Sequence, residues 1–482
     1  MEQMLSPYLV ALFWVSLLMP VGILLRNKIS FLQNNLVPAS LISGFIGMIL
    51  MNLGLIGVPT PNGWAAIEFS TFALVTTLIF TANFILIGLS AGKPSDGAGA
   101  GKEMTRGVVW LSTTFVGGYG VLIVVGILVI WGYNALTQSD LETATALNMV
   151  SGFTGGPAQA LTIAQLWVNN VNNPDIFNFM NISEDVLVMA VSYGAIGFVV
   201  AAFVGVPLAK MGLKKGLAQH THIEKMDPPF LKGVMEKTSN EPLGRHTLHP
   251  ANMDTLSFHF VLLGVAFFFT WIICYAMKNA LPSDVSGLGF GLMYMWGMFL
   301  AIFLRKLIVK VKVDHLVDDQ VIHRMNGLFV DFMMVTALMS VQWGVLSKYI
   351  VPFVLTVALA SLALFFWFWI PSRWLGKSGL ERFLVNYAAC TGTFASSLLL
   401  MRIVDPKGES LVPAEAGFSQ FIMIIPVAPL ALYMFPTLGV KTSLETIFQV
   451  GVFILLACTA LMLILKYVGY WQSGKTNSQS DT

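Results

Sequence analysis

The sequence predicts an all-α integral membrane protein of about eleven transmembrane helices, with two opposed re-entrant hairpins in inverted-topology repeats. Three observations lead to this prediction. The 482-residue chain is 56% hydrophobic and only 11% charged, whereas soluble domains carry roughly 25% charged residues. Its mean hydropathy is +0.75. Apolar segments recur along the whole chain, and two of them are interrupted by runs of small and polar residues.

The transmembrane helices are predicted from segment length, because a helix that crosses a bilayer needs about 20 apolar residues. Two apolar stretches, 140–168 and 383–402, are broken by Gly, Ser and Thr and are therefore treated separately. The eleven uninterrupted stretches are 7–25, 37–57, 68–90, 107–131, 184–209, 255–277, 286–304, 327–347, 350–370, 414–435 and 445–470.

Basic residues indicate how these segments are oriented. Connections rich in Lys and Arg alternate with connections that have none, and Lys and Arg are enriched on the cytoplasmic side of membrane proteins. We therefore expect a multi-pass protein of the cell inner (plasma) membrane with its N-terminus outside and its C-terminus cytoplasmic. The basic connections are 26–36, 91–106, 210–254, 305–324 and 371–382, and those without Lys or Arg are 58–67, 132–140 and 169–183.

The two broken stretches fit this pattern as re-entrant hairpins. Stretch 140–168 lies between two connections without basic residues, so it is expected to enter from outside and return there. Stretch 383–402 has basic residues on both sides and is expected to enter and return on the cytoplasmic side. The alternative for each is a single spanning helix with a break, which would disturb the alternation of charge.

The order of segments then repeats. Five spans with a hairpin between the fourth and fifth make up 1–209, and the same order recurs in 255–436 with opposite orientation. The segment NMVSGFTGGPAQAL (148–161) corresponds in position to VNYAACTGTFASSL (385–398). Residues 210–254 form a predicted cytoplasmic linker, and 437–482 an added transmembrane helix with a tail. Inverted repeats with broken helices are typical of secondary transporters.

Both interruptions supply groups that bind ions. Backbone N–H groups at the start of a half-helix favour a carboxylate, whereas carbonyls and hydroxyls favour Na⁺, a hard cation. The alternative is that Gly and Ser only permit close helix packing. The candidate substrate-binding residues are Ser151, Gly152, Thr154, Gly155, Gly156 and Gln159 in the first interruption, and Thr391, Gly392, Thr393, Ser396 and Ser397 in the second.

Three further polar residues lie in or beside apolar segments and are candidate positions for Na⁺ or another coupling ion. Asn83 and Asn148 offer carbonyl oxygens, although each also suits an interhelical hydrogen bond. Asp331 is an intramembrane acid, which by default suggests function, but it is close enough to the cytoplasmic end to reach interfacial water. No phosphate-binding loop or catalytic nucleophile–base–acid arrangement is recognisable, so we expect no enzyme and no cofactor besides the coupling ion. The net charge of +2 and the scattered Lys and Arg predict no nucleic-acid partner.

With these motifs in view, the chain resembles the bacterial sodium/glutamate symporter family over nearly its whole length. The likeness includes FLQNNLVPASLISGFIG (31–47), IFTANFILIGLS (79–90) and both interruptions. The resemblance implies a homodimer of inverted repeats in the lipid bilayer, with Na⁺-driven glutamate uptake through an elevator-like movement of the hairpin domain. Two loops depart from the family. Its first loop is often Gly-Gly-His-Gly-Thr-Gly, against SGFTGGP (151–157) here, and its second is richer in Gly than CTGTFASS (390–397).

The expected function is therefore a sodium-coupled secondary transporter (symporter) of glutamate or a similar small organic anion. Because the two loops that differ from the family are expected to contact the anion, the sequence does not determine which anion is transported. Two alternatives keep the fold: a cation- or proton-coupled transporter of another carboxylate, and a passive anion channel, whose selectivity would come from pore-lining groups.

Overall fold

The structure is a computed structural model. Most of the predicted linker 210–254 lies outside the described residues, as do most of loop 169–183, the end of span 414–435 and the tail after 471. The described residues are 7–34, 36–60, 63–90, 100–139, 141, 143–171, 185–218, 232–234, 244–249, 251–280, 288–405, 410–429 and 443–471.

Eight helices among these residues are long and apolar enough to cross a membrane. In this coarse form the predicted class, an all-α membrane protein, is confirmed. The eight are α1 (Pro7–Lys28), α4 (Phe69–Ser90), most of α5 (Ala100–Thr137), α7 with α8 (Asp185–Phe203 and Gly205–Lys214), α10 (Thr255–Ala280), α13 (Asp319–Met339), α15 (Ile350–Ser372) and α20 (Leu444–Tyr467).

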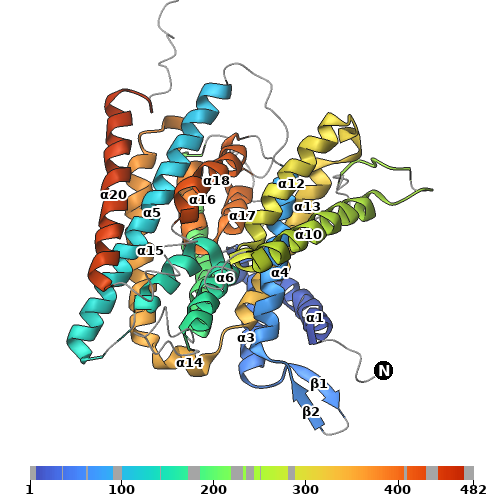
Figure 1. Ribbon diagram of the computed structural model, residues 1–482, viewed down its shortest axis with the longest axis horizontal. Coiled ribbons are helices and arrows are strands. Elements are labelled where there is room, and N and C mark those ends of the chain that lie inside the picture. The colour runs from blue at the N-terminus through green and yellow to red at the C-terminus, as the bar shows by residue number, and fades with distance from the viewer. Residues whose placement is uncertain are drawn as a thin grey trace, which may run out of the picture. The chain divides into compact units, whose positions relative to one another are not determined.

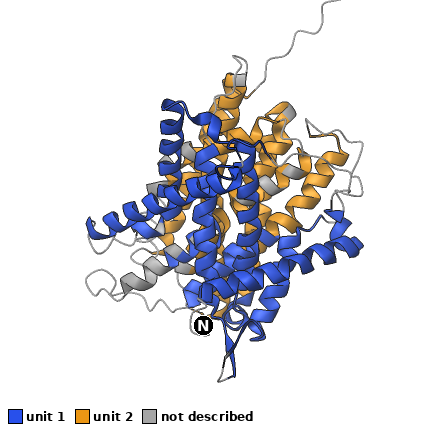
Figure 2. Ribbon diagram, turned by 90° about the vertical axis from the view of Figure 1, so that its right-hand side faces the viewer, with its two compact units in different colours: residues 1–94, 155–199, 226–350 blue, residues 95–154, 200–225, 351–482 orange. Residues whose placement is uncertain are grey.

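The chain divides into two compact units, coloured separately in Figure 2. Unit 1 contains Met1–Pro94, Gly155–Val199 and Met226–Ile350. Unit 2 contains Ser95–Thr154, Val200–Lys225 and Val351–Thr482. Each unit thus combines residues from both predicted repeats. One unit boundary falls between Thr154 and Gly155, inside the first broken stretch.

In unit 1, α13 packs against both α3 (Ala39–Asn52) and α4, and α4 also packs against α12 (Met293–Lys310). In Figure 1, α3 and α4 are blue, and α10, α12 and α13 run from yellow-green to yellow. Apolar side chains fill most of these contacts, and a buried hydrogen bond from Thr76 Oγ1 to Thr336 Oγ1, at 2.8 Å, joins α4 to α13. The smaller helices of this unit are α2 (Ser30–Asn34), α11 (Leu288–Gly291), η1 (Asp314–Leu316) and α14 (Trp343–Lys348).

Unit 1 differs from the sequence prediction after residue 52. The predicted span 37–57 is in fact α3, whose 14 residues are about 21 Å long, short of the roughly 30 Å hydrocarbon core. It is followed by a β-hairpin of β1 (Gly57–Thr60) and β2 (Gly63–Ala66), paired from Gly57–Ala66 to Thr60–Gly63. Trp14 Nε1 donates to the Gly57 carbonyl at 2.9 Å and ties this hairpin to α1. The predicted loop 58–67 therefore contains regular structure.

A buried histidine joins α10 to the start of α13. The backbone N–H of Asp318 donates to His259 Nε2 at 2.9 Å, so Nε2 carries no proton and Nδ1, 2.7 Å from the Thr255 carbonyl, donates. Asp318 in turn caps α13, because its Oδ1 accepts from the N–H groups of Gln320 and Val321 at 3.0 Å each. His259 thus holds the cap in place.

We expect His259→Leu to destabilise the folded protein by about 1–3 kcal/mol, because it leaves the part-buried Asp318 N–H without an acceptor. The measurement is an unfolding titration of the purified full chain in detergent. His315→Leu, an exposed histidine in η1, is the matched control and is expected to stay within about 0.5 kcal/mol. Equal effects of the two substitutions would contradict this account of His259.

In unit 2, α5 is the longest helix, with 38 residues and a length of about 57 Å. α20 and α18 (Val412–Pro429) both pack along it. The backbones of α5 and α20 approach closely where Gly120 faces Gly451, since a Cβ at Gly120 would lie 2.9 Å from the Gly451 carbonyl oxygen. Small residues at such crossings are typical of helices packed in membranes. The remaining elements are η2 (Gly376–Ser378), α16 (Gly379–Gly392) and α17 (Phe394–Val404).

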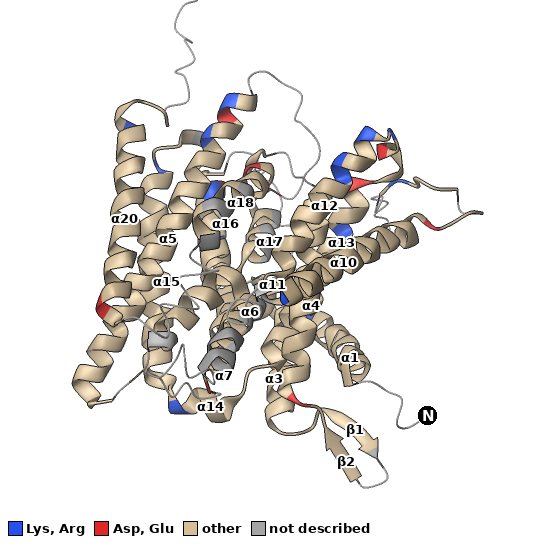
Figure 3. Ribbon diagram, in the orientation of Figure 1, with Lys and Arg blue, Asp and Glu red and all other residues tan. Residues whose placement is uncertain are grey.

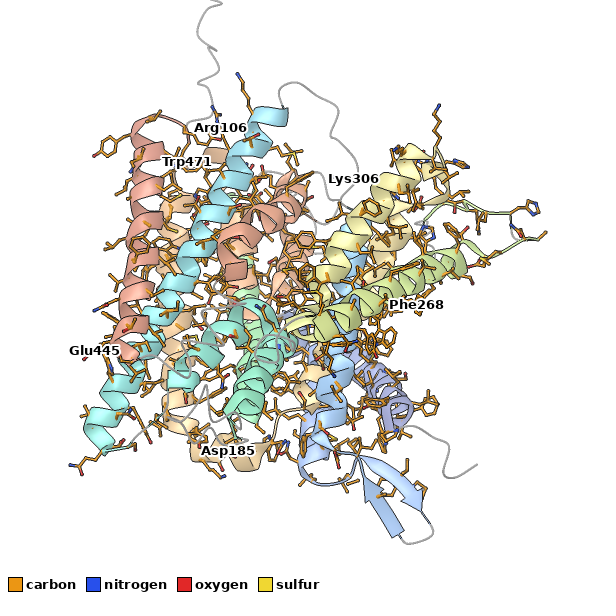
Figure 4. All side chains as sticks on the ribbon, viewed as in Figure 1. Arg106, Asp185, Phe268, Lys306, Glu445 and Trp471 are labelled. Carbon is orange, nitrogen blue, oxygen red and sulfur yellow. The ribbon has the colours of Figure 1, made fainter. Side chains whose placement is uncertain are left out.

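Several helices present large apolar side chains outward. Phe268 on α10 is 57% exposed and Phe453 on α20 is 72% exposed, and Figure 4 shows Phe268 on the outer face of α10. Contiguous exposed apolar surface on this scale is unfavourable in water. These faces therefore suit contact with lipid, in agreement with the low charge of the chain.

Candidate functional site: two helix breaks with a shared sequence

The second broken stretch folds back on itself. α16 ends at Gly392 and α17 begins at Phe394, and Ser397 Oγ donates to the Val385 carbonyl at 2.7 Å. Twelve residues of continuous helix would separate these positions by about 18 Å. The chain therefore reverses at Thr393, and α16 and α17 form a helical hairpin within unit 2.

Thr393, at the turn, is unusual in three ways. Its backbone has φ 83° and ψ 164°, a conformation that is a genuine outlier for a β-branched residue. The side chain is 2% exposed, and its hydroxyl has no hydrogen-bond partner. It is also the N-cap of α17, yet the hydroxyl does not cap the helix. Strained backbone of this kind costs about 1–3 kcal/mol and clusters at functional sites.

The first broken stretch is interrupted in the same way. α6 (Thr143–Val171) contains one non-helical residue, Gly156, with φ 74° and ψ −175°. Pro157 follows and begins the second half, as is common for Pro at the first position of a helix. A Cβ at Gly194 of α7 would overlap the backbone of Pro157, so only glycine lets α7 approach the break this closely.

The two breaks occupy equivalent positions. The sequence Thr154-Gly155-Gly156 matches Thr391-Gly392-Thr393, and in both the third residue has positive φ with an extended ψ. Glycine adopts this conformation at no steric cost, whereas threonine does so against its preference. The sequence correspondence predicted between 148–161 and 385–398 thus coincides with a shared backbone conformation.

Most of the predicted hydroxyls are buried and already use their protons. Each donates to a carbonyl of its own helix or hairpin, and a hydroxyl has only one proton but two lone pairs. These side chains therefore present oxygen acceptors, which suit a cation, and not donors for a carboxylate. The bonds are Ser151 to Leu147 (3.0 Å), Thr154 to Val150 (2.7 Å), Thr391 to Tyr387 (2.8 Å), Ser396 to Gly392 (2.7 Å) and Ser397 to Val385 (2.7 Å).

The remaining predicted residues at the breaks are also buried. Gly152 lies inside the first half of α6, and Gly392 is the last residue of α16. Gln159 is 5% exposed, and a Cβ at Gly155 would overlap its Oε1. The amide of Gln159 therefore lies against the break in α6 and depends on glycine at position 155.

Of the three predicted ion positions, Asn83 and Asp331 belong to unit 1 and Asn148 belongs to unit 2. Asp331 Oδ1 accepts from Ser40 Oγ at 3.0 Å, which joins α13 to α3. Asn83 is 3% exposed, its Nδ2 lies 4.0 Å from Met333 Sδ and its Oδ1 has no partner. Asn148 is fully buried in unit 2, on the α6 half before the break. Across the described chain, no group of three or more His, Cys, Asp and Glu could hold a metal ion.

Sequence reasoning missed a buried ion pair at the base of the hairpin. Arg382 Nε and Nη2 donate to the Glu415 carboxylate at 2.8 and 2.7 Å, and both side chains are at most 3% exposed. A Cβ at Gly107 of α5 would overlap the same carboxylate, so three helices meet there. Asn386 adds donors to the Leu111 carbonyl at 2.9 Å and Thr114 Oγ1 at 2.7 Å.

Two other buried polar groups were not among the predicted residues. Tyr387 Oη on α16 and Asn326 Oδ1 on α13 lack hydrogen-bond partners, which is costly for buried polar atoms. Tyr387 lies one turn before Thr391 and stacks on Phe383. The position of Tyr387 inside the interrupted stretch 383–402 was the sequence feature that could have identified it as a candidate.

Neither a scan against protein-family models nor a search of curated proteins finds a match to this chain. The resemblance to sodium/glutamate symporters therefore rests on the quoted segments.

Proposed function

We propose that the chain is a sodium-coupled secondary transporter of glutamate or a similar small organic anion. One observation carries the proposal: two helix breaks with a common Thr-Gly-X sequence adopt the same backbone conformation, at Gly156 and Thr393. Irregular backbone at membrane depth is tolerated only where protein buries it or it lines a cavity. Paired broken helices are how many secondary transporters bind substrate and coupling ion.

In this proposal the anion binds at the start of α17. The first N–H groups of a helix lack intrahelical acceptors and carry a partial positive charge that attracts a carboxylate. Among the predicted hydroxyls, that of Thr393 is the one that still has a proton to donate, since its Oγ1 is buried without a partner. A carboxylate at this position would accept hydrogen bonds from the first N–H groups of α17 and from the Thr393 hydroxyl.

Na⁺ would bind the oxygen acceptors of the breaks. The hydroxyls of Ser151, Thr154, Thr391 and Ser396 donate to backbone carbonyls, so their lone pairs remain for a cation. Anion and cation together neutralise one another, which lowers the cost of moving either through a low-dielectric path. That neutralisation is the proposed basis of coupling.

The proposal includes the finer topology. The α16–α17 hairpin and the two halves of α6 are re-entrant from opposite sides, the repeats are inverted, and two chains form a homodimer in the plasma membrane. The N-terminus lies outside and the C-terminus in the cytoplasm. The alternation of basic connections supports this orientation.

Ligand-dependent stability of the purified full chain tests the proposal. A ligand that binds only the folded state stabilises it by about 2.7 kcal/mol at one hundred times its dissociation constant. We expect L-glutamate to raise the unfolding midpoint in Na⁺ and to have no effect when K⁺ replaces Na⁺. A panel of dicarboxylates and amino acids in Na⁺ then identifies the preferred anion. Stabilisation of equal size in Na⁺ and K⁺ would overturn the sodium coupling, and the absence of any stabilising carboxylate would overturn the proposal.

Substitution of Asp331 separates sodium coupling from the proton-coupled alternative, in which this carboxylate would carry the proton. Because Asp331 accepts from Ser40 at 3.0 Å, its simplest role is to join α3 and α13. We expect Asp331→Asn to retain Na⁺-dependent uptake within about threefold, since the amide oxygen still accepts that hydrogen bond. Uptake into liposomes at pH 6 and pH 8 is the measurement. Loss of uptake together with loss of its pH dependence would favour proton coupling through this residue.

A further inference from the structure

A groove on unit 2 has the form of a lipid chain site. It has a volume of about 480 Å³ and is lined by residues of α5, α15 and α20, among them Val121, Ala363, Phe366 and Leu463. From Ala363 to Pro371 it follows eight residues of α15, about 12 Å of helix, and Trp374 lies in the turn that comes after this helix. The helical part of the groove therefore fits within one leaflet, half of the roughly 30 Å hydrocarbon core.

The groove wall offers almost nothing to a polar ligand. Two of its polar side chains use their protons inside unit 2: Thr459 Oγ1 donates to the Leu455 carbonyl at 2.7 Å, and Trp367 Nε1 to the Thr114 carbonyl at 2.7 Å. Phe366 and Ile370 are 51% and 55% exposed and form its open side. An apolar chain is therefore the occupant that the wall fits.

One end of the groove is cationic. The ammonium of Lys466 lies 4.2 Å from the ring centre of Trp374, which lines the groove. The neighbouring Arg373 has its guanidinium 5.1 Å from the ring of Trp369. Both cations are exposed. Because aromatic faces hold them in place, their N–H groups can turn towards an anion at the groove mouth.

The position of this end along α20 matches the membrane surface. Lys466 and Glu445 are 21 residues apart, about 32 Å of helix, so they mark the two edges of the hydrocarbon core. Figure 4 shows Glu445 at one end of α20 and Trp471 and Arg106 at the other, and Figure 3 shows basic residues at that second end. Trp and Lys are the side chains expected at headgroup depth.

We propose that this groove binds an anionic phospholipid, with one acyl chain along α15 and its phosphate on Arg373 and Lys466. Charge complementarity selects the headgroup, since each Lys or Arg near a membrane surface adds attraction for anionic lipid. The site is independent of the transport proposal, because none of its residues belongs to the helix breaks.

Lipid titration of the purified full chain, followed by native mass spectrometry, tests this site. The probes are phosphatidylglycerol and phosphatidylcholine with identical acyl chains. We expect phosphatidylglycerol to bind at least tenfold more tightly, and Arg373→Gln/Lys466→Gln to weaken it about tenfold with phosphatidylcholine unchanged. Ala363→Trp, which fills the inner end, should weaken both lipids. Lys306→Gln/Lys310→Gln, two exposed cations of unit 1, should change neither.

Three results would overturn the proposal. Equal affinity for the two lipids would remove the headgroup selectivity. Unchanged phosphatidylglycerol binding in Arg373→Gln/Lys466→Gln would show that these cations do not hold the phosphate. If Ala363→Trp leaves lipid binding intact and changes the oligomeric state, the groove is an interface between two copies of the chain.

Discussion

Glu415→Ala is expected to destabilise the folded protein by about 3–5 kcal/mol, because it leaves Arg382 as an uncompensated buried charge. The two side chains make a bidentate pair at 2.7 and 2.8 Å, and Glu415 is 0% exposed. Arg382→Ala is expected to cost as much. The double substitution Arg382→Met/Glu415→Met should recover most of the loss, since buried pairs contribute little net stability compared with apolar residues of similar size.

The measurement is the free energy of unfolding of the two single variants and the double variant, from denaturant titration of the purified chain in detergent. The matched control is an exposed ion pair, Lys348–Asp185, at 3.1 Å with Lys348 60% exposed. Lys348→Ala should cost less than about 1 kcal/mol. If Glu415→Ala costs as little as the control, the pair does not anchor the α16–α17 hairpin to α18.

Thr393→Gly is expected to stabilise the protein and to impair transport. Glycine adopts φ 83° freely, so the substitution removes about 1–3 kcal/mol of backbone strain. It also removes the unpartnered hydroxyl proposed to donate to the substrate carboxylate. A lost hydrogen bond to a charged group is worth about 1.5–3 kcal/mol, or more than a tenfold loss in transport efficiency.

Two conservative variants separate the hydroxyl from the backbone. Thr393→Ser keeps the hydroxyl and should retain transport, whereas Thr393→Val keeps the β-branched shape and should lose it. Unfolding titrations and initial rates of uptake into liposomes are the paired measurements. Transport by Thr393→Val at the rate of the unsubstituted protein would show that the hydroxyl does not contact substrate, whatever the effect of glycine on stability.

The breaks were predictable from sequence because their signals are local. Thr-Gly-Gly-Pro at 154–157 and Thr-Gly-Thr at 391–393 combine poor helix formers with small residues, and the helices are interrupted there. The strain at Thr393 was not predictable, since threonine gives no warning of a positive φ. The hydrogen bonds of the predicted hydroxyls were not predictable either, and the structure shows five of them donating to carbonyls.

Other features were missed for different reasons. The β-hairpin after α3 had a local signal, Pro61-Asn62-Gly63, a combination that marks turns, but residues 58–67 were predicted as a loop without regular structure. The partner of Arg382 had no such signal. Glu415 lies 33 residues away on another helix, and only the folded chain brings the two together.

Accumulation of glutamate in liposomes tests the central claim most directly. The purified full chain is reconstituted and loaded with no glutamate, and labelled L-glutamate is added outside with an inward Na⁺ gradient or an equal K⁺ gradient. The account predicts accumulation above the external concentration with Na⁺, its collapse when the gradient is dissipated, and none with K⁺. Entry that only equilibrates, at the same rate in Na⁺ and K⁺, would contradict it and indicate a passive anion channel.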